Sequence, residues 1–98
     1  MKKYKIFING KNFQIKLNEK MTKCGFYTTK YIEANNPEEA RSLVMDMLSS
    51  DDKLKDVVKN DKNDPPIIYA DEISEVESFD SKDLKIGISW YKETSRGL

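Results

Sequence analysis

Apolar and polar residues alternate on both sides of an Asn-Gly pair near the start of the chain. The apolar positions in this pattern are Tyr4, Ile6, Ile8, Phe13, Ile15 and Leu17. Such alternation is typical of half-buried strands, and Asn-Gly is the preferred pair for a two-residue type I′ turn. Closing the chain at Asn9-Gly10 places the apolar side chains on one face. The pattern therefore predicts a β-hairpin over residues 3–16.

The segment 26–34 is dense in aromatic and β-branched residues, which favours a third strand after a polar connection over 18–25. Alternate positions of this strand point to opposite sides of a sheet, and both sets contain aromatic or aliphatic side chains. A strand that is apolar on both faces is usually central, or is covered on its second side.

A helix is predicted to begin at Asn36-Pro37-Glu38-Glu39. Asn36 can cap it, Pro37 suits the first helical position, and Glu39 stands where a capping box places its acid. The residues that recur at helical spacing, and so predict its buried stripe, are Ala40, Leu43, Val44, Met47 and Leu48. Residues 49–52 are expected to end this helix, and a shorter helical segment follows over 51–59.

Two more strands complete the predicted fold. One covers residues 67–76 with a bulge near Ser74-Glu75, and the other covers 86–91. The order β-β-β-α-(α)-β-β predicts the α+β class, with a mainly antiparallel sheet of about five strands and one main amphipathic helix on one face. Residues 1–91 are expected to form one domain, and residues 92–98 a flexible C-terminal tail.

Composition narrows the possible partners and the compartment. The 17 basic and 17 acidic side chains cancel, which argues against nucleic acid because a general binder needs excess Lys and Arg to displace counterions. No apolar run reaches the roughly 18 residues of a membrane span. The single cysteine, Cys24, cannot form an internal disulfide. A small soluble protein of the reducing cytoplasm is therefore expected.

Histidine is absent from the sequence, which excludes Ser-His-Asp and Cys-His nucleophilic sites and the usual zinc sites. The oxygen-rich loop 61–64 lacks the glycine and the distal glutamate of an EF-hand loop, so we interpret it as a solvated turn. The acids between Asp71 and Asp83 are interpreted as charge that discourages sheet-to-sheet aggregation. We therefore predict no catalytic residue, no metal and no cofactor, and expect that the protein is not an enzyme.

The most informative side chains are the aromatic and hydroxyl-bearing residues of the third and last strands. The candidate interaction surface comprises Phe26, Tyr27, Thr28, Thr29, Tyr31, Ile32, Trp90 and Tyr91. Three interpretations are open. The rings fill the core, or they are buried against a second copy or a protein partner, where Tyr and Trp are favoured. Alternatively, beside Lys3, Lys5 and Lys16, they stack on a nucleotide or another ligand.

The segment Gly25–Ala34, continued by Pro37–Ala40, resembles a G-F-Y-T-T-x-Y-x-E-A-x-x-P-E-E-A segment of a family of small bacterial proteins of uncharacterised function. Asp64-Pro65-Pro66 and the aromatic end at Trp90-Tyr91 are similar too, so the resemblance extends over most of the chain. It implies a bacterial source, but it implies no activity and no site residue.

One amphipathic helix cannot shelter both faces of the third strand. The lead hypothesis is therefore a small non-catalytic interaction module that self-associates, as a homodimer, or binds a protein partner through a sheet face. The alternative is a regulatory or sequestering protein that binds a small ligand or nucleotide.

Overall fold

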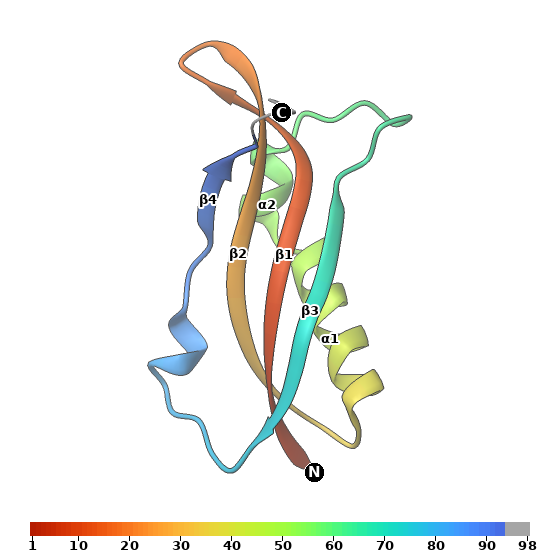
Figure 1. Cartoon of the computed structure of the whole chain (residues 1–98), viewed down its shortest axis with the longest axis vertical. Helices are drawn as coiled ribbons and strands as arrows, with labels where there is room; N and C mark the ends of the chain where they lie inside the picture. Colours follow the sequence, from red (N-terminus) through yellow and green to blue (C-terminus); the bar gives the residue numbers. More distant parts are fainter. Residues whose placement is uncertain (94–98) are drawn as a thin grey trace.

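The two longest strands lie side by side at the centre of an antiparallel sheet (Figure 1). The structure, a computed structural model, describes residues 1–93. Its elements are β1 (Lys2–Leu17), β2 (Lys20–Ala34), α1 (Pro37–Ser49), α2 (Asp52–Val57), β3 (Ile67–Val76), the 3-10 helix η1 (Asp83–Lys85) and β4 (Ser89–Lys92). The strand order is β3-β1-β2-β4, and every neighbouring pair is antiparallel. The chain is therefore α+β, with a four-stranded sheet and one main helix.

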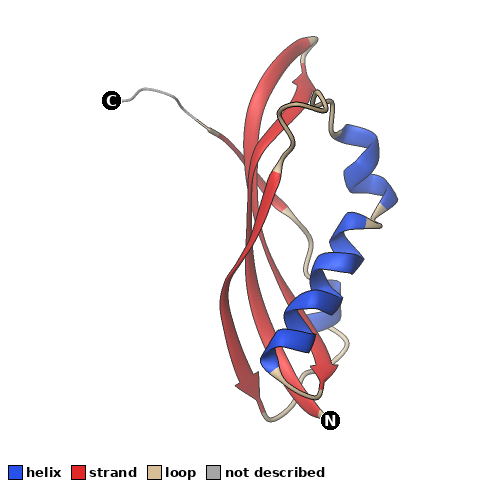
Figure 2. Ribbon diagram, turned by 90° about the vertical axis from the view of Figure 1, so that its right-hand side faces the viewer, coloured by secondary structure: helices blue, strands red, loops and turns tan. Residues whose placement is uncertain are grey.

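Both α-helices lie on the same side of the sheet (Figure 2). The buried core lies between them and the strands, and it comprises Tyr4, Ile6, Ile8, Phe13, Ile15, Cys24, Phe26, Ala34, Ala40, Val44, Leu48 and Leu54. Within residues 1–93 no helix covers the opposite face of the sheet. The fold thus has two layers. On the side of the sheet away from the helices, Phe79 of the loop after β3 packs against Tyr31, with 5.7 Å between ring centroids.

The hairpin turn predicted at Asn9-Gly10 is wrong, because both residues lie inside the uninterrupted strand β1. The chain turns instead at Asn18-Glu19, where φ is 49° and 67°. Positive φ at both central residues is the signature of a type I′ turn, and Leu17 pairs with Lys20 across it. The two strands of the predicted hairpin therefore merge into β1. Part of the predicted connection over 18–25 joins the predicted third strand in β2, so the expected five strands become four.

A β-bulge in β1 explains why the alternation of apolar and polar residues predicted a turn at Asn9-Gly10. Lys11 and Asn12 together oppose Gly25 on β2, and Asn12 adopts a φ of 61°. The extra residue shifts the phase of the strand, so Phe13 returns to the face that already carries Ile8. A bulge and a two-residue hairpin turn place the same side chains on one face, so the apolar pattern cannot distinguish them.

The predicted start of α1 is confirmed. Asn36 Oδ1 accepts a hydrogen bond from the Glu39 N–H (2.8 Å), and Pro37 occupies the first turn. The Glu39 carboxylate accepts from the N–H of Asn35 (3.0 Å), one residue earlier than in a standard capping box. The buried stripe is narrower than predicted, because Leu43 and Met47 are exposed.

Several boundaries late in the chain differ from the prediction. The bulge in β3 lies at Asp71 rather than near 74–75, and β4 begins at Ser89 rather than at 86. The expected tail, 92–98, starts with two residues that are bonded to β2. Lys92 pairs with Cys24, and the Glu93 N–H donates to the carbonyl of Lys23 (2.9 Å). Residues 94–98 lie outside the described residues.

The turn at Asn18-Glu19 gives a first testable prediction. A glutamate at φ 67° is strained, whereas glycine adopts this region freely. We expect Glu19→Gly to raise the free energy of unfolding by about 0.5–1 kcal/mol in a urea titration. The matched control is Glu33→Gly in the extended part of β2, which should lower it. Equal destabilisation by both changes would contradict the assignment of the turn.

Candidate functional site

Strand geometry divides the predicted interaction surface between the two sides of the sheet. Phe26, Thr28 and Ile32 face the helices, and the first two are buried. Trp90 lies on the same side as Phe26, its partner across β2 and β4. The other four predicted residues, Tyr27, Thr29, Tyr31 and Tyr91, stand on the side that the helices leave uncovered. The structure thus brings half of the predicted set together.

We call this uncovered side the open face. Its side chains, taken from the strand registers, include Lys3, Lys5, Phe7, Asn9, Tyr27, Thr29, Tyr31, Glu33, Tyr69, Glu72 and Tyr91. Two aromatic contributors were not predicted, Phe7 on β1 and Tyr69 on β3. The sequence did contain a signal for Phe7. This large apolar residue follows Lys3 and Lys5 on the side of the predicted strand that is otherwise polar.

Three aromatic rings cross the open face in a stack that we call the aromatic strip. Phe7 of β1 stacks on Tyr27 of β2 at 5.5 Å between ring centroids, and Tyr27 stacks on Tyr91 of β4 at 5.0 Å. Tyr27, in the middle, keeps 43% of its surface exposed. The strip therefore presents stacked rings to solvent from three different strands.

Asn9 on β1 and Gly25 on β2 hold Tyr91 in place beneath the strip. The Tyr91 hydroxyl donates to Oδ1 of Asn9 (3.1 Å), an amide that is itself buried. Gly25 leaves room for the ring, since a Cβ there would stand 2.3 Å from Tyr91 Cζ. Burial, followed by the neighbouring Tyr27, raises the pKa of the Tyr91 hydroxyl, which further favours its neutral, hydrogen-donating form. The strip is therefore preorganised.

Charges of both signs surround the strip. Lys3 on β1 stands opposite Glu33 on β2, and Glu72 on β3 stands opposite Phe7. A recess of about 320 Å³ lies beside the strip, and it is lined by Lys5, Phe7, Thr29, Glu72 and Ser74. The open face thus combines projecting rings, a hollow, and charged groups of both signs.

The aromatic residues on the helix side have a structural role. Phe13, Phe26 and Trp90 form a three-ring cluster. Each pair of rings meets edge-on, with 5.2–5.7 Å between ring centroids. The Thr28 hydroxyl donates to the carbonyl of Gly87 (3.0 Å), which ties the segment before β4 to β2. These contacts fix the core and the edge of the sheet.

The loop 61–64 is tied to the β1 bulge by hydrogen bonds. The Asn12 side chain donates to the Asp64 carboxylate (2.8 Å), and the Asn60 side chain donates to the carbonyls of Asn12 and Asp64 (both 2.8 Å). Over residues 1–93, no three His, Cys, Asp or Glu side chains are grouped to hold a metal ion. The loop therefore has a structural explanation that needs no ligand.

Cys24 is 3% exposed, and burial raises the pKa of its thiol despite the opposing effect of Lys92. Because the thiolate is the reactive form, we expect alkylation of the native protein at pH 7.5 to be at least about 100-fold slower than in 6 M urea. Mass spectrometry of samples quenched over time measures both rates. Equal rates would mean that the thiol is accessible in the folded chain.

No family model, curated protein or solved structure matches the chain. The resemblance to small bacterial proteins therefore stays a prediction. Among the helices of the described residues, none has the length and apolar character that crossing a bilayer requires.

Proposed function

We propose that the protein is a non-catalytic interaction module that forms a homodimer through its open face. The observation that carries the proposal is the aromatic strip. Phe7, Tyr27 and Tyr91 stack across three strands on the side of the sheet opposite α1 and α2, with Tyr27 43% exposed. Aromatic residues, tyrosine above all, are enriched at the centres of protein interfaces because they bury large area with few rotatable bonds.

The charge distribution supports a second copy of the chain as the partner. A two-fold interface brings the same patch together with itself, so each patch must complement its own charges. The open face meets this requirement with lysines on β1 and acids on β2 and β3, among them Lys3, Lys5, Glu33 and Glu72. The formal net charge of the chain is zero, so two copies do not repel each other at long range.

Shape and rigidity support the same partner. The sheet runs along the 44 Å dimension of the molecule, which leaves room for the roughly 800 Å² per partner that a stable dimer buries (Figure 1). Projecting rings lie next to the recess that Glu72 and Ser74 help to line, so a ring of one copy can enter the recess of the other. The hydrogen bond from Tyr91 to Asn9 holds one end of the strip before association, which lowers the entropic cost of binding.

The experiment that tests the proposal compares two charged substitutions by sedimentation equilibrium. Tyr27→Glu buries an unpaired carboxylate at the proposed interface, so we expect it to weaken dimerisation at least about 100-fold. Met47→Glu is the matched control, because the Met47 side chain is also exposed (51%, against 43% for Tyr27) but lies on α1. It should change the dissociation constant less than about threefold.

Both substituted side chains are exposed, so circular dichroism should show folded protein for each variant. A wild-type chain that stays monomeric at every concentration contradicts the proposal. Equal weakening by Tyr27→Glu and Met47→Glu contradicts the choice of face.

The alternative function, binding of a small ligand, is favoured by a different observation. It is an apolar cavity of about 380 Å³ on the helix side of the sheet, within the size range of small-molecule sites. This cavity is separate from the aromatic strip, so binding there is compatible with dimerisation through the open face.

A further inference from the structure

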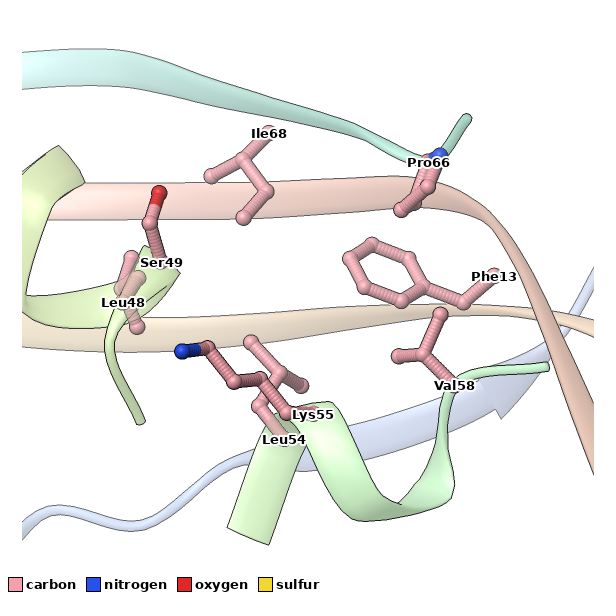
Figure 3. A pocket seen from close by; sticks show the side chains of 8 residues that line it. All are labelled: Phe13, Leu48, Ser49, Leu54, Lys55, Val58, Pro66 and Ile68. Carbon is pink, nitrogen blue, oxygen red and sulfur yellow. The ribbon is translucent and has the colours of Figure 1, made fainter. Parts of the chain in front are cut away.

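The break between α1 and α2 leaves a cavity over the sheet, which we call the junction cavity (Figure 3). Its volume is about 380 Å³, and its lining residues are Phe13, Leu48, Ser49, Leu54, Lys55, Val58, Pro66 and Ile68. Helix α1 ends at Ser49 and α2 begins at Asp52. Because no helical turn covers the strands between these points, β1 and β3 form the floor of the cavity.

The lining of the junction cavity is divided by polarity. Most of its walls are aliphatic or aromatic, and the polar side chains are Lys55 and Ser49. In Figure 3 the Lys55 amino group and the Ser49 hydroxyl both lie toward the end of α1, whereas Phe13 and Val58 lie toward the opposite end. A molecule that fits this division has one polar end and one apolar end.

The charge of Lys55 is available to a ligand. In the part of the chain that the structure describes, the one ion pair joins Lys2 to Glu75 at 3.8 Å. The nearby carboxylate of Asp51 is engaged as the cap of α2, where it accepts from the N–H of Leu54 (3.1 Å). A cation beside apolar walls and without a protein counter-ion favours an anionic group on the ligand.

We propose that the junction cavity binds an aliphatic carboxylate of medium chain length. The carboxylate pairs with the Lys55 amino group and accepts a hydrogen bond from the Ser49 hydroxyl. The hydrocarbon chain extends along Leu54 toward Phe13 and Val58, out of water. Each added methylene should tighten binding about fourfold, the change that corresponds to about 0.8 kcal/mol, until the chain reaches the end of the cavity.

A neighbouring cavity provides the internal control. It has a volume of about 420 Å³, lies against the other flank of α2, and is lined by Lys30, Asp51, Lys53 and Trp90 among others. Lys53 and Lys55 are both exposed lysines on the same short helix, but each lines a different cavity. Substituting either one changes the net charge of the chain by the same amount.

The test is a titration of ¹⁵N-labelled protein with hexanoate, octanoate and octanol, followed by amide chemical shifts. We expect saturable shifts at Val58 and Ile68, octanoate binding about 15-fold tighter than hexanoate, and octanol at least about tenfold weaker than octanoate. Lys55→Gln should weaken octanoate binding about tenfold, whereas Lys53→Gln should leave it within twofold.

Three results would overturn the proposal: no saturable shift at the junction cavity, equal binding of octanol and octanoate, or equal losses in Lys53→Gln and Lys55→Gln. Tyr27→Glu should bind octanoate with unchanged affinity, because Tyr27 lies on the opposite side of the sheet. The outcome is therefore independent of the dimer proposal.

Discussion

Replacing Gly10 by alanine is expected to lower the free energy of unfolding by about 2–4 kcal/mol. A Cβ at this position would stand 2.2, 2.6 and 2.7 Å from three atoms of the Phe26 ring. That ring is fully buried and packed edge-on against Phe13 and Trp90, so it cannot move aside without disturbing the three-ring cluster. The clash outweighs the gain in strand propensity that alanine brings.

Gly87→Ala is the control for this substitution. Nothing lies within 4 Å of a Cβ at Gly87, and its φ is not in the positive region. We expect the free energy of unfolding of this control to change by no more than about 0.5 kcal/mol. Both variants are measured by urea titration monitored by circular dichroism. If Gly10→Ala proved as mild as Gly87→Ala, the close packing of Phe26 over β1 would be wrong.

Phe26→Ala is expected to lower the free energy of unfolding by about 3–5 kcal/mol. That is a large part of the total free energy of unfolding of a small domain, which is about 5–15 kcal/mol. The substitution removes a fully buried ring from contact with Phe13 and Trp90, and the surrounding strands cannot collapse into the space. Fluorescence of Trp90, the only tryptophan, reports the loss of this packing directly.

A double-mutant cycle connects these two predictions. Once Phe26 is replaced by alanine, the methyl group introduced by Gly10→Ala no longer meets the Phe26 ring. Gly10→Ala should then lower the free energy of unfolding by at least about 1 kcal/mol less than it does in the wild-type chain. Strict additivity would show that the cost of Gly10→Ala comes from the backbone of β1 and not from the Phe26 ring.

The helical part of the fold could be predicted because its signals are local. Asn36, Pro37 and Glu39 define the start of α1 through contacts within a few residues, and those contacts are present. The strand signals were ambiguous for a physical reason. A bulge at Asn12 and a turn at Asn9-Gly10 produce the same apolar face, and the actual turn uses Asn18-Glu19, a pair with weaker turn preference.

The candidate site could be predicted only in part, because it depends on register. The residue types of 26–34 indicated a strand with two apolar faces, and that is the arrangement of β2. The side on which each residue stands depends on the bulge opposite Gly25 and on the short pairing with β4. No local pattern brings Phe7 beside Tyr27, because their contact requires the long β1–β2 pairing that begins at the Asn18-Glu19 turn.

The two glycines of the central strands have matching roles on opposite sides of the sheet. Gly10 lets Phe26 cover β1 on the helix side, and Gly25 lets Tyr91 cover β2 on the open face. Aromatic rings over strand glycines shield the backbone and fix the register. The same arrangement therefore builds the core on one side and the proposed dimer surface on the other.

The most direct test of the central claim is an isotope-filtered NOE measurement on dimers mixed from labelled and unlabelled chains. The proposal predicts contacts between copies that involve the rings of Phe7, Tyr27 and Tyr91, with none from Leu43 or Met47 on α1. Contacts between copies that arise only from α1 or from the outer edge of β3 would contradict it, as would a chain that gives none at millimolar concentration.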